Sequence, residues 1–160
     1  TTDIYTLSLH DALPISTLAN VAPLVPAALA TYQPDIMLLA IGTNDTGNLS
    51  GWQTAHLALV DTILNASPSV KLVCAKIAAC ASWASVNAAG LASINTYVDA
   101  NVTARAGTGR VKIADLNRPL PSPNPVRDPW LWTFDGIHPT DAGYLHMAHI
   151  WLDAVEAWLP

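Results

Sequence analysis

Apolar residues follow two different spacings along this chain, and these spacings predict its secondary structure. Three continuous apolar runs are typical of strands that are buried on both faces. Between and around these runs, apolar residues recur three or four positions apart, as in amphipathic helices. The predicted strands are residues 35–41, 70–77 and 111–116, and the predicted helices are residues 17–32, 52–66, 86–105 and 140–158.

The order of these elements predicts the fold class. Strands that alternate with helices form right-handed βαβ units, and therefore a parallel, doubly wound α/β sheet. In such sheets, functional groups gather beyond the carboxyl ends of the strands. The last helix is expected to bury one apolar stripe, formed by Tyr144, Met147, Ala148, Trp151, Leu152 and Val155.

Residues 1–16 differ from the rest of the chain. Ile4, Tyr5 and Leu7 alternate well enough to form a strand, but the string also resembles a translated sequencing adapter. We therefore expect residues 1–16 to be a non-native or disordered segment, and residues 17–160 to form one partial domain. The apolar run 36–41 would be prone to pairing with other chains at an open sheet edge, which predicts that a strand beside it is missing or replaced.

Two short motifs carry candidate chemistry. The sequence GTND at residues 42–45 directly follows the first predicted strand, and DGIHP at residues 135–139 directly precedes the last predicted helix. Both motifs therefore fall at the same edge of the predicted sheet. Either motif alone could be only a loop or turn sequence, but together, in this order, they indicate a functional site.

These motifs resemble those of the SGNH hydrolases, also called GDSL esterases and lipases. The stretch YQPDIMLLAIGTND is similar to the third sequence block of that family, and DGIHPTDAGYLHMAHIW is similar to the fifth block and the helix behind it. The resemblance covers about residue 17 to the C-terminus. It implies a flavodoxin-like, three-layer α/β/α sandwich that hydrolyses an ester with a serine nucleophile and needs no metal or organic cofactor.

The chemistry of ester hydrolysis gives the matching residues their expected roles. His138 is the expected general base, because an imidazole titrates near neutral pH. Asp135 is close enough in sequence to accept the ring N–H and hold one tautomer. The side-chain amide of Asn44 is expected to donate a hydrogen bond to the tetrahedral oxyanion. The further expected substrate-binding residues are Gly42, Thr43, Asp45 and Trp132.

Two of those residues also have expected roles in the loop itself. Gly42 allows the backbone to turn sharply off the strand. Asp45 is expected to fix the loop through hydrogen bonds to nearby backbone N–H groups.

Trp130, Trp132 and Phe134 could stack on a sugar ring, although such aromatic residues more often pack a long loop against the domain.

Two parts of the family pattern have no match in the sequence. A Gly-Asp-Ser block is absent, and no glycine convincingly matches the second block. Ser8 and Ser16 are the serines that precede the GTND motif, and neither follows Gly-Asp. We therefore expect this chain to lack the nucleophile. The alternative is a catalytically incompetent domain that binds an ester or a glycan.

A metal-dependent hydrolase is a further alternative. Its ligands would be Asp135, His138, His146 and His149. Two histidines at this spacing are more often partly exposed helix residues, so we expect no metal site. A nucleotide-binding domain is disfavoured because no G-x-G-x-x-G follows a predicted strand.

Composition narrows the range of partners. The formal net charge is −5 and no basic patch is present, which argues against a nucleic-acid partner. No apolar run is long enough to span a membrane. Cys74 is expected to be a core residue, and a disulfide with Cys80 is an open alternative.

The expected substrate is a small-molecule or glycan ester, with an acetylated carbohydrate favoured over a lysophospholipid. The oligomeric state and the compartment, secreted or cytoplasmic, stay open.

Overall fold

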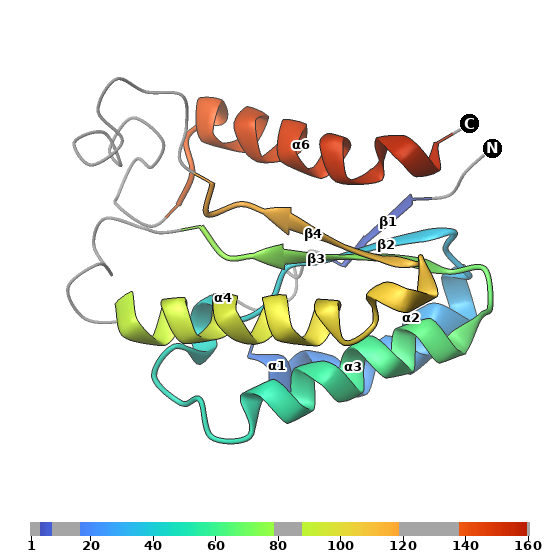
Figure 1. Ribbon diagram of the computed structural model, residues 1–160, viewed down its shortest axis with the longest axis horizontal. Helices are drawn as coiled ribbons and strands as arrows, with labels where there is room; N and C mark the ends of the chain where they lie inside the picture. The colour runs from blue at the N-terminus through green and yellow to red at the C-terminus, as the bar shows by residue number, and fades with distance from the viewer. Residues whose placement is uncertain (1–3, 8–16, 79–87, 119–137, 160) are drawn as a thin grey trace.

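The computed structural model describes residues 4–7, 17–78, 88–118 and 138–159, and its centre is a parallel sheet (Figure 1). The strands lie in the order β1 (Ile4–Leu7), β2 (Ile36–Leu39), β3 (Lys71–Lys76) and β4 (Val111–Asp115). Every neighbouring pair is parallel, with Ile36 beside Lys71 and Cys74 beside Ile113. The predicted α/β class and parallel sheet are therefore confirmed.

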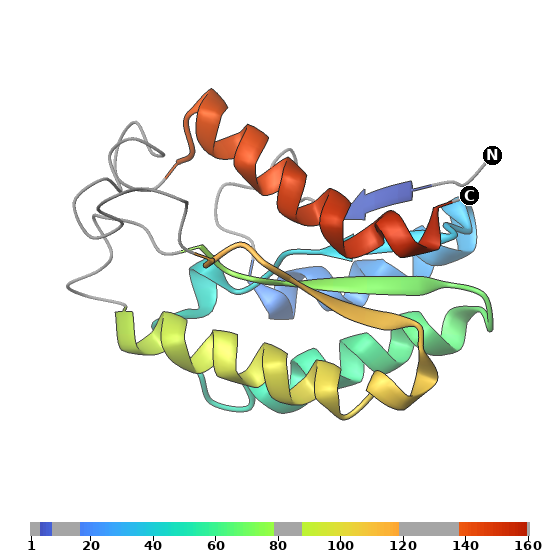
Figure 2. The same cartoon turned by 45° about the horizontal axis from the view of Figure 1, so that its top comes forward.

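Helices cover both faces of this sheet, as Figures 1 and 2 show. One face carries α1 (Leu18–Val21), α2 (Val25–Tyr32), α3 (Trp52–Ala66) and α4 (Ala88–Thr103). The other face carries α6 (Asp141–Val155), which continues into the short 3-10 helix η5 (Glu156–Trp158). The molecule is thus the three-layer α/β/α sandwich that the family resemblance implies.

Alternate residues of each central strand supply two separate cores. On β2, Met37 and Leu39 pack toward α1 to α4, while Ile36 and Leu38 belong to the cluster beneath α6. Every residue of β2 is buried, as the continuous apolar run predicted. Cys74 is a free, buried core residue, and its predicted alternative partner Cys80 lies outside the described residues.

The helix predicted over residues 17–32 is divided in the structure. The 3-10 helix η2 (Ala22–Leu24) separates α1 from α2. Pro23 and Pro26 are the second residues of η2 and α2, in the first turn, where the missing backbone N–H is tolerated. The prolines therefore shift the helix geometry without ending the helical path.

The predicted apolar stripe of the last helix is only partly correct. Met147, Trp151 and Val155 face the sheet, but Tyr144 and Leu152 are 45% and 53% exposed, and Ala148 is exposed as well. The buried line is completed by Ile150, Ala154 and Trp158. Its members recur three or four positions apart, so residues beside this line turn toward solvent.

The sheet position beside β2 is occupied by β1, which comes from the N-terminal segment. Ile4 lies opposite Ile36 and Leu7 lies opposite Leu39. The alternation of apolar residues that favoured a strand here is therefore matched by a strand in the structure. That residues 1–16 are foreign to the domain stays a prediction.

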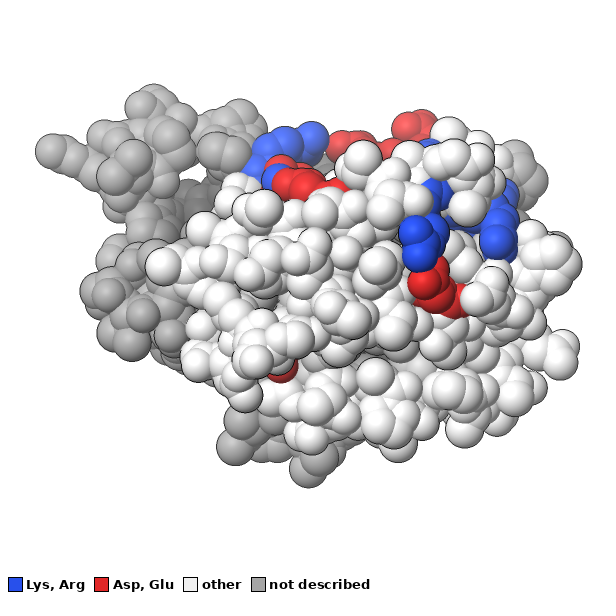
Figure 3. Space-filling model, turned by 60° about the horizontal axis from the view of Figure 1, so that its bottom comes forward, with Lys and Arg blue, Asp and Glu red and all other residues white. Residues whose placement is uncertain are grey.

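The surface formed by α3 and α4 is largely uncharged, as Figure 3 shows. The ion pairs on the described residues include Asp61 with Arg105, at 2.6 Å, and Lys76 with both Asp99 and Asp115. Within the ranges described above, no helix has the length and apolar character needed to cross a bilayer.

Candidate active site

The GTND motif forms a tight turn immediately beyond the carboxyl end of β2. Gly42 has φ +131°, and residues 43–45 continue as the 3-10 turn η3 (Thr43–Asp45). The backbone N–H of Asp45 donates to the carbonyl of Gly42 at 2.9 Å, which closes this turn. Asn44 is exposed at its centre, whereas Gly42 and Asp45 are buried. The turn therefore presents the Asn44 side chain at the surface from an anchored backbone.

Gly42 is required by both conformation and space. Its φ lies in the region that favours glycine. A Cβ at this position would lie 2.9 Å from Cγ2 of Ile94 and 3.2 Å from Cζ2 of Trp52. The predicted sharp turn at Gly42 is confirmed, and the structure adds that α3 and α4 pack directly against it.

The carboxylate of Asp45 is bound to the start of α1. Its Oδ2 and Oδ1 accept the backbone N–H of Leu18 at 3.0 and 3.3 Å. Thr17, the residue before α1, makes no side-chain cap of its own. Asp45 therefore satisfies a helix-terminal donor that is remote in sequence, rather than only the nearby N–H groups that the sequence suggested.

His138 lies just before α6, and the start of that helix is well defined. Oγ1 of Thr140 accepts the backbone N–H of Gly143 at 3.2 Å, which is the N-cap of α6. The Thr140 carbonyl also accepts the N–H of Tyr144 at 2.8 Å. His138 is exposed two residues before this cap. The cap thus fixes where the chain that carries His138 joins the helix.

The structure brings the turn after β2 and the start of α6 to the same edge of the sheet. Figures 1 and 2 show that the strands point toward this edge, where α6 and α4 both begin. Asn44 and His138 are thus carried by segments at one edge, as predicted. The other expected site residues, Asp135 and Trp132, lie outside the described residues, as do Trp130 and Phe134.

A buried aromatic and amide cluster supports the turn from below. The Trp52 ring stacks on the His56 ring with centroids 4.8 Å apart, and Nδ1 of His56 lies 3.0 Å from Nδ2 of Asn101. Burial lowers the pKa of His56 from 6.5 to about 4, so this imidazole is neutral at pH 7. His56 is therefore a structural residue of the core beneath the turn.

Sequence reasoning did not identify Trp52, Gly90 and Ile94 as neighbours of the turn. The spacing of Trp52, His56 and Leu59 in α3 could have placed the first two inside the domain. Nothing comparable marks Gly90, because its role depends on the approach of α4 to a loop distant in sequence.

The histidines of α6 do not form a metal site with other described residues. His146 is partly buried, and desolvation together with Arg118 and His149 lowers its pKa. His149 is exposed. Among residues 4–7, 17–78, 88–118 and 138–159, no three His, Cys, Asp or Glu side chains gather in a way that could hold a metal ion.

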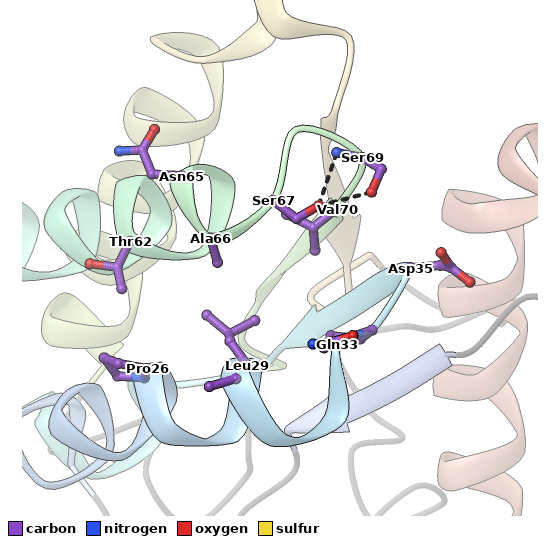
Figure 4. Close-up of a pocket in the computed structure, with 12 residues that line it drawn as sticks. Pro26, Leu29, Gln33, Asp35, Thr62, Asn65, Ala66, Ser67, Ser69 and Val70 are labelled. Carbon is purple, nitrogen blue, oxygen red and sulfur yellow. Dashed lines mark hydrogen bonds between the residues drawn. The ribbon is translucent and has the colours of Figure 1, made fainter.

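A hollow lies at the opposite edge of the sheet, between the ends of α2 and α3 (Figure 4). Its lining includes Leu29, Gln33 and Asn65, and the hydroxyl groups of Ser67 and Ser69 lie 2.9 Å apart at its border. Asp35 and Val70, the residues just before β2 and β3, also line it. The hollow is therefore remote from the carboxyl ends of the strands, where the motifs lie.

Comparison with known proteins gives matches to this chain in both sequence and fold. Residues 10–145 match the model of the GDSL-like Lipase/Acylhydrolase family. The chain is also 29% identical over 133 residues to a multidomain esterase of Ruminococcus flavefaciens, a match that spans 80% of this chain and 16% of that protein.

Solved structures give the same result. A family 3 carbohydrate esterase of Clostridium thermocellum is 25% identical, with a TM-score of 0.69 over 89% of this chain and 66% of that one. An acetyl esterase mutant with acetate ion is 26% identical, with a TM-score of 0.64 over 84% of this chain and 63% of that one. A family 3 carbohydrate esterase from Talaromyces cellulolyticus, at 23% identity and a TM-score of 0.67, shares the fold over 84% of this chain and 64% of that one.

Proposed function

Because this chain belongs to the GDSL-like lipase/acylhydrolase family, we propose that its site acts on carboxylic esters through Asn44, Asp135 and His138. The observation that carries the proposal is the shared location of two motifs. The turn after β2 exposes Asn44, and the segment before α6 carries His138, both at the carboxyl edge of the parallel sheet. Ligands of doubly wound folds bind at this edge.

The proposed chemistry is serine-type ester hydrolysis. His138 takes the proton of the attacking hydroxyl group and returns it to the leaving alcohol, while Asp135 holds the imidazole in one tautomer. A water molecule, deprotonated by His138 in the same way, then attacks the acyl group and releases it from the serine as the carboxylic acid. Asn44 donates its side-chain N–H to the oxyanion that forms when the ester carbonyl is attacked. A donor of this kind contributes on the order of 10²–10³ in rate. No step requires a metal or organic cofactor.

The proposed substrate is an acetyl ester of a carbohydrate. The relatives with 25% and 26% identity are a family 3 carbohydrate esterase and an acetyl esterase with acetate ion. Trp132, close before His138 in sequence, is the proposed contact to a sugar ring, because an aromatic face packs well against the apolar face of a sugar.

A second function is supported by one feature of the sequence. The chain contains no Gly-Asp-Ser, so the segment that supplies the nucleophile in this family has no match. A domain with an oxyanion donor and an imidazole but no activated serine would bind an acetyl ester or its product without turnover. Loss of a nucleophile lowers kcat by about 10⁶ in a comparable enzyme.

A fluorophosphonate probe separates these two functions, because only an activated serine reacts with it. Labelling of one serine, together with hydrolysis of 4-nitrophenyl acetate, supports the hydrolase and identifies its nucleophile by peptide mapping. His138→Ala should abolish both signals, whereas His149→Ala, which changes an exposed histidine of α6, should leave both intact. Absence of labelling and turnover, with acetate still bound, supports the binding function. Absence of binding as well contradicts both.

A further inference from the structure

Helix α4 contacts the backbone at Thr46, where the turn that carries Asn44 ends. Gly90, in the first turn of α4, lies so close to Thr46 that an added Cβ would overlap the Thr46 carbonyl oxygen. The same Cβ would lie 3.0 Å from the carbonyl carbon and 3.1 Å from Cα of Thr46. These atoms belong to the backbone, so they cannot move aside as a flexible side chain could.

One helical turn after Gly90, the same helix contacts Gly42, where the loop that carries Asn44 begins. Ile94 is fully buried, and its Cγ2 would lie 2.9 Å from a Cβ on Gly42. Gly42 and Thr46 therefore both rest on α4. Asn44 lies midway between these two contacts and is exposed. One helix thus holds both ends of a short turn whose central residue, Asn44, is exposed.

The next residue of α4 attaches the helix to the end of β3. Asn95 is buried, and its Oδ1 accepts the N–H of Ile77 at 2.7 Å while its Nδ2 donates to the Ile77 carbonyl at 3.0 Å. This pair of hydrogen bonds satisfies the backbone just after β3 as a neighbouring strand would. Helix α4 therefore links the exits of β2 and β3 at the edge where the motifs lie.

We propose that Gly90, Ile94 and Asn95 are positioning residues that set the location of the Asn44 side-chain amide relative to the strand ends. This inference rests on the proposed function for its catalytic meaning. An oxyanion donor is effective when it is held in place before the reaction, because no reorganisation is then needed in the transition state. Of the three, Gly90 should tolerate substitution least, because the atoms next to it are backbone atoms of Thr46.

The test compares Gly90→Ala with Gly47→Ala. Gly47 lies in the same loop, is exposed and has no heavy atom within 4 Å of an added Cβ. In ¹H–¹⁵N spectra of the labelled protein, the Asn44 side-chain signals are assigned by their loss in Asn44→Ala. Gly90→Ala should shift them, and Gly47→Ala should not. This measurement does not depend on turnover, so it stays informative if the protein proves not to be a hydrolase.

Thermal unfolding gives a second, independent test of the contact between Gly90 and Thr46. Alanine is a better helix former than glycine, so a merely helical position would gain stability from Gly90→Ala. The contact with Thr46 predicts a lower Tm instead. If Gly90→Ala does not fold, Asn95→Asp keeps the acceptor for the Ile77 N–H, removes the donor to its carbonyl, and should also shift the Asn44 signals.

A double-mutant cycle connects the positioning to catalysis. In an active protein, Gly90→Ala should lower kcat for 4-nitrophenyl acetate by about 10-fold or more with little change in KM, and should have an effect of about 2-fold or less when Asn44 is already alanine. A folded Gly90→Ala variant with unshifted Asn44 signals would overturn the proposal. Equal losses of kcat in both backgrounds would overturn it too, because the residue would then act independently of Asn44.

Discussion

The carboxylate of Asp45 accepts the backbone N–H of Leu18, with Oδ2 at 3.0 Å and Oδ1 at 3.3 Å from the nitrogen. Both residues are buried. The bond joins the turn that carries Asn44 to the first residue of α1, so the same four-residue motif that presents a catalytic candidate also caps a helix. This explains why an aspartate follows Asn44 without requiring that it touch a substrate.

Replacing Asp45 should therefore destabilise the fold. Asp45→Ala leaves the buried N–H of Leu18 without its acceptor, and an unsatisfied buried group of this kind costs about 1–3 kcal/mol. Urea unfolding at pH 7 measures the loss, with Asn48→Ala, an exposed residue of the same loop, as the matched control. An unchanged unfolding midpoint for Asp45→Ala would show that the bond contributes nothing to stability.

Three glycines should respond to alanine in a graded way. Gly42→Ala combines a positive φ with overlap at Ile94 and should cost about 2–4 kcal/mol. Gly51 has φ +70° but no close neighbour, so Gly51→Ala should cost about 1–2 kcal/mol. Gly47→Ala should change stability by about 0.5 kcal/mol or less. A Gly42→Ala variant as stable as Gly47→Ala in denaturant unfolding would contradict the packing around the turn.

The buried imidazole of His56 should make the protein sensitive to mild acid. Burial lowers its pKa from 6.5 to about 4, so the unfolded chain binds more protons than the folded chain between these values. This contribution to stability is present above pH 6.5 and decreases as the pH falls toward 4, by about 3 kcal/mol in all. Urea unfolding as a function of pH measures the slope.

A variant isolates this contribution. His56→Gln should remove the pH dependence between 4 and 6.5 while lowering the stability at pH 7, because it disturbs the stack on Trp52 and the contact with Asn101. His149→Gln, at an exposed position, should leave the slope as in the wild type. If His56→Gln keeps the full slope, other groups cause the acid sensitivity.

In an active protein, removal of the oxyanion donor should reduce turnover much more than binding. Asn44→Ala should lower kcat by on the order of 10²–10³ because the amide acts mainly on the tetrahedral oxyanion. Asn48→Ala is the control, since it changes an exposed asparagine of the same loop that carries no proposed role. Steady-state kinetics with 4-nitrophenyl acetate measure both. Equal kcat values for the two variants would remove Asn44 from the mechanism.

The sequence predicted secondary structure best where the apolar pattern matches the burial of the element in the fold. The predicted helix over residues 52–66 has the same bounds as α3, and the run from Ile36 produced a strand buried on both faces. Local patterns were less informative for α6, because Tyr144 and Leu152 have suitable apolar character but lie on the flank of the buried line. Amphipathic spacing alone does not fix how a helix is rotated on its sheet.

For the candidate site, the sequence indicated the two motifs but not the residues that hold them in place. Gly42 and Asn44 are marked by their place after a buried strand. The contacts of Gly90 with Thr46 and of Asp45 with Leu18 join segments that are far apart in sequence, and neither residue type indicates such a partner. Tertiary contacts of this kind depend on how helices approach the sheet edge, which no local pattern encodes.

Titration with acetate tests the central claim, that Asn44 and His138 serve one small ester site, without requiring turnover. The side-chain amide of Asn44 and the ring of His138 are followed together in spectra of the labelled protein, with Asn48 and His149 as reference signals. The account predicts that the signals of Asn44 and His138 shift along one binding curve with a single Kd, while the reference signals stay in place. Shifts with two different Kd values, or a shift of only one of the two residues, would contradict it.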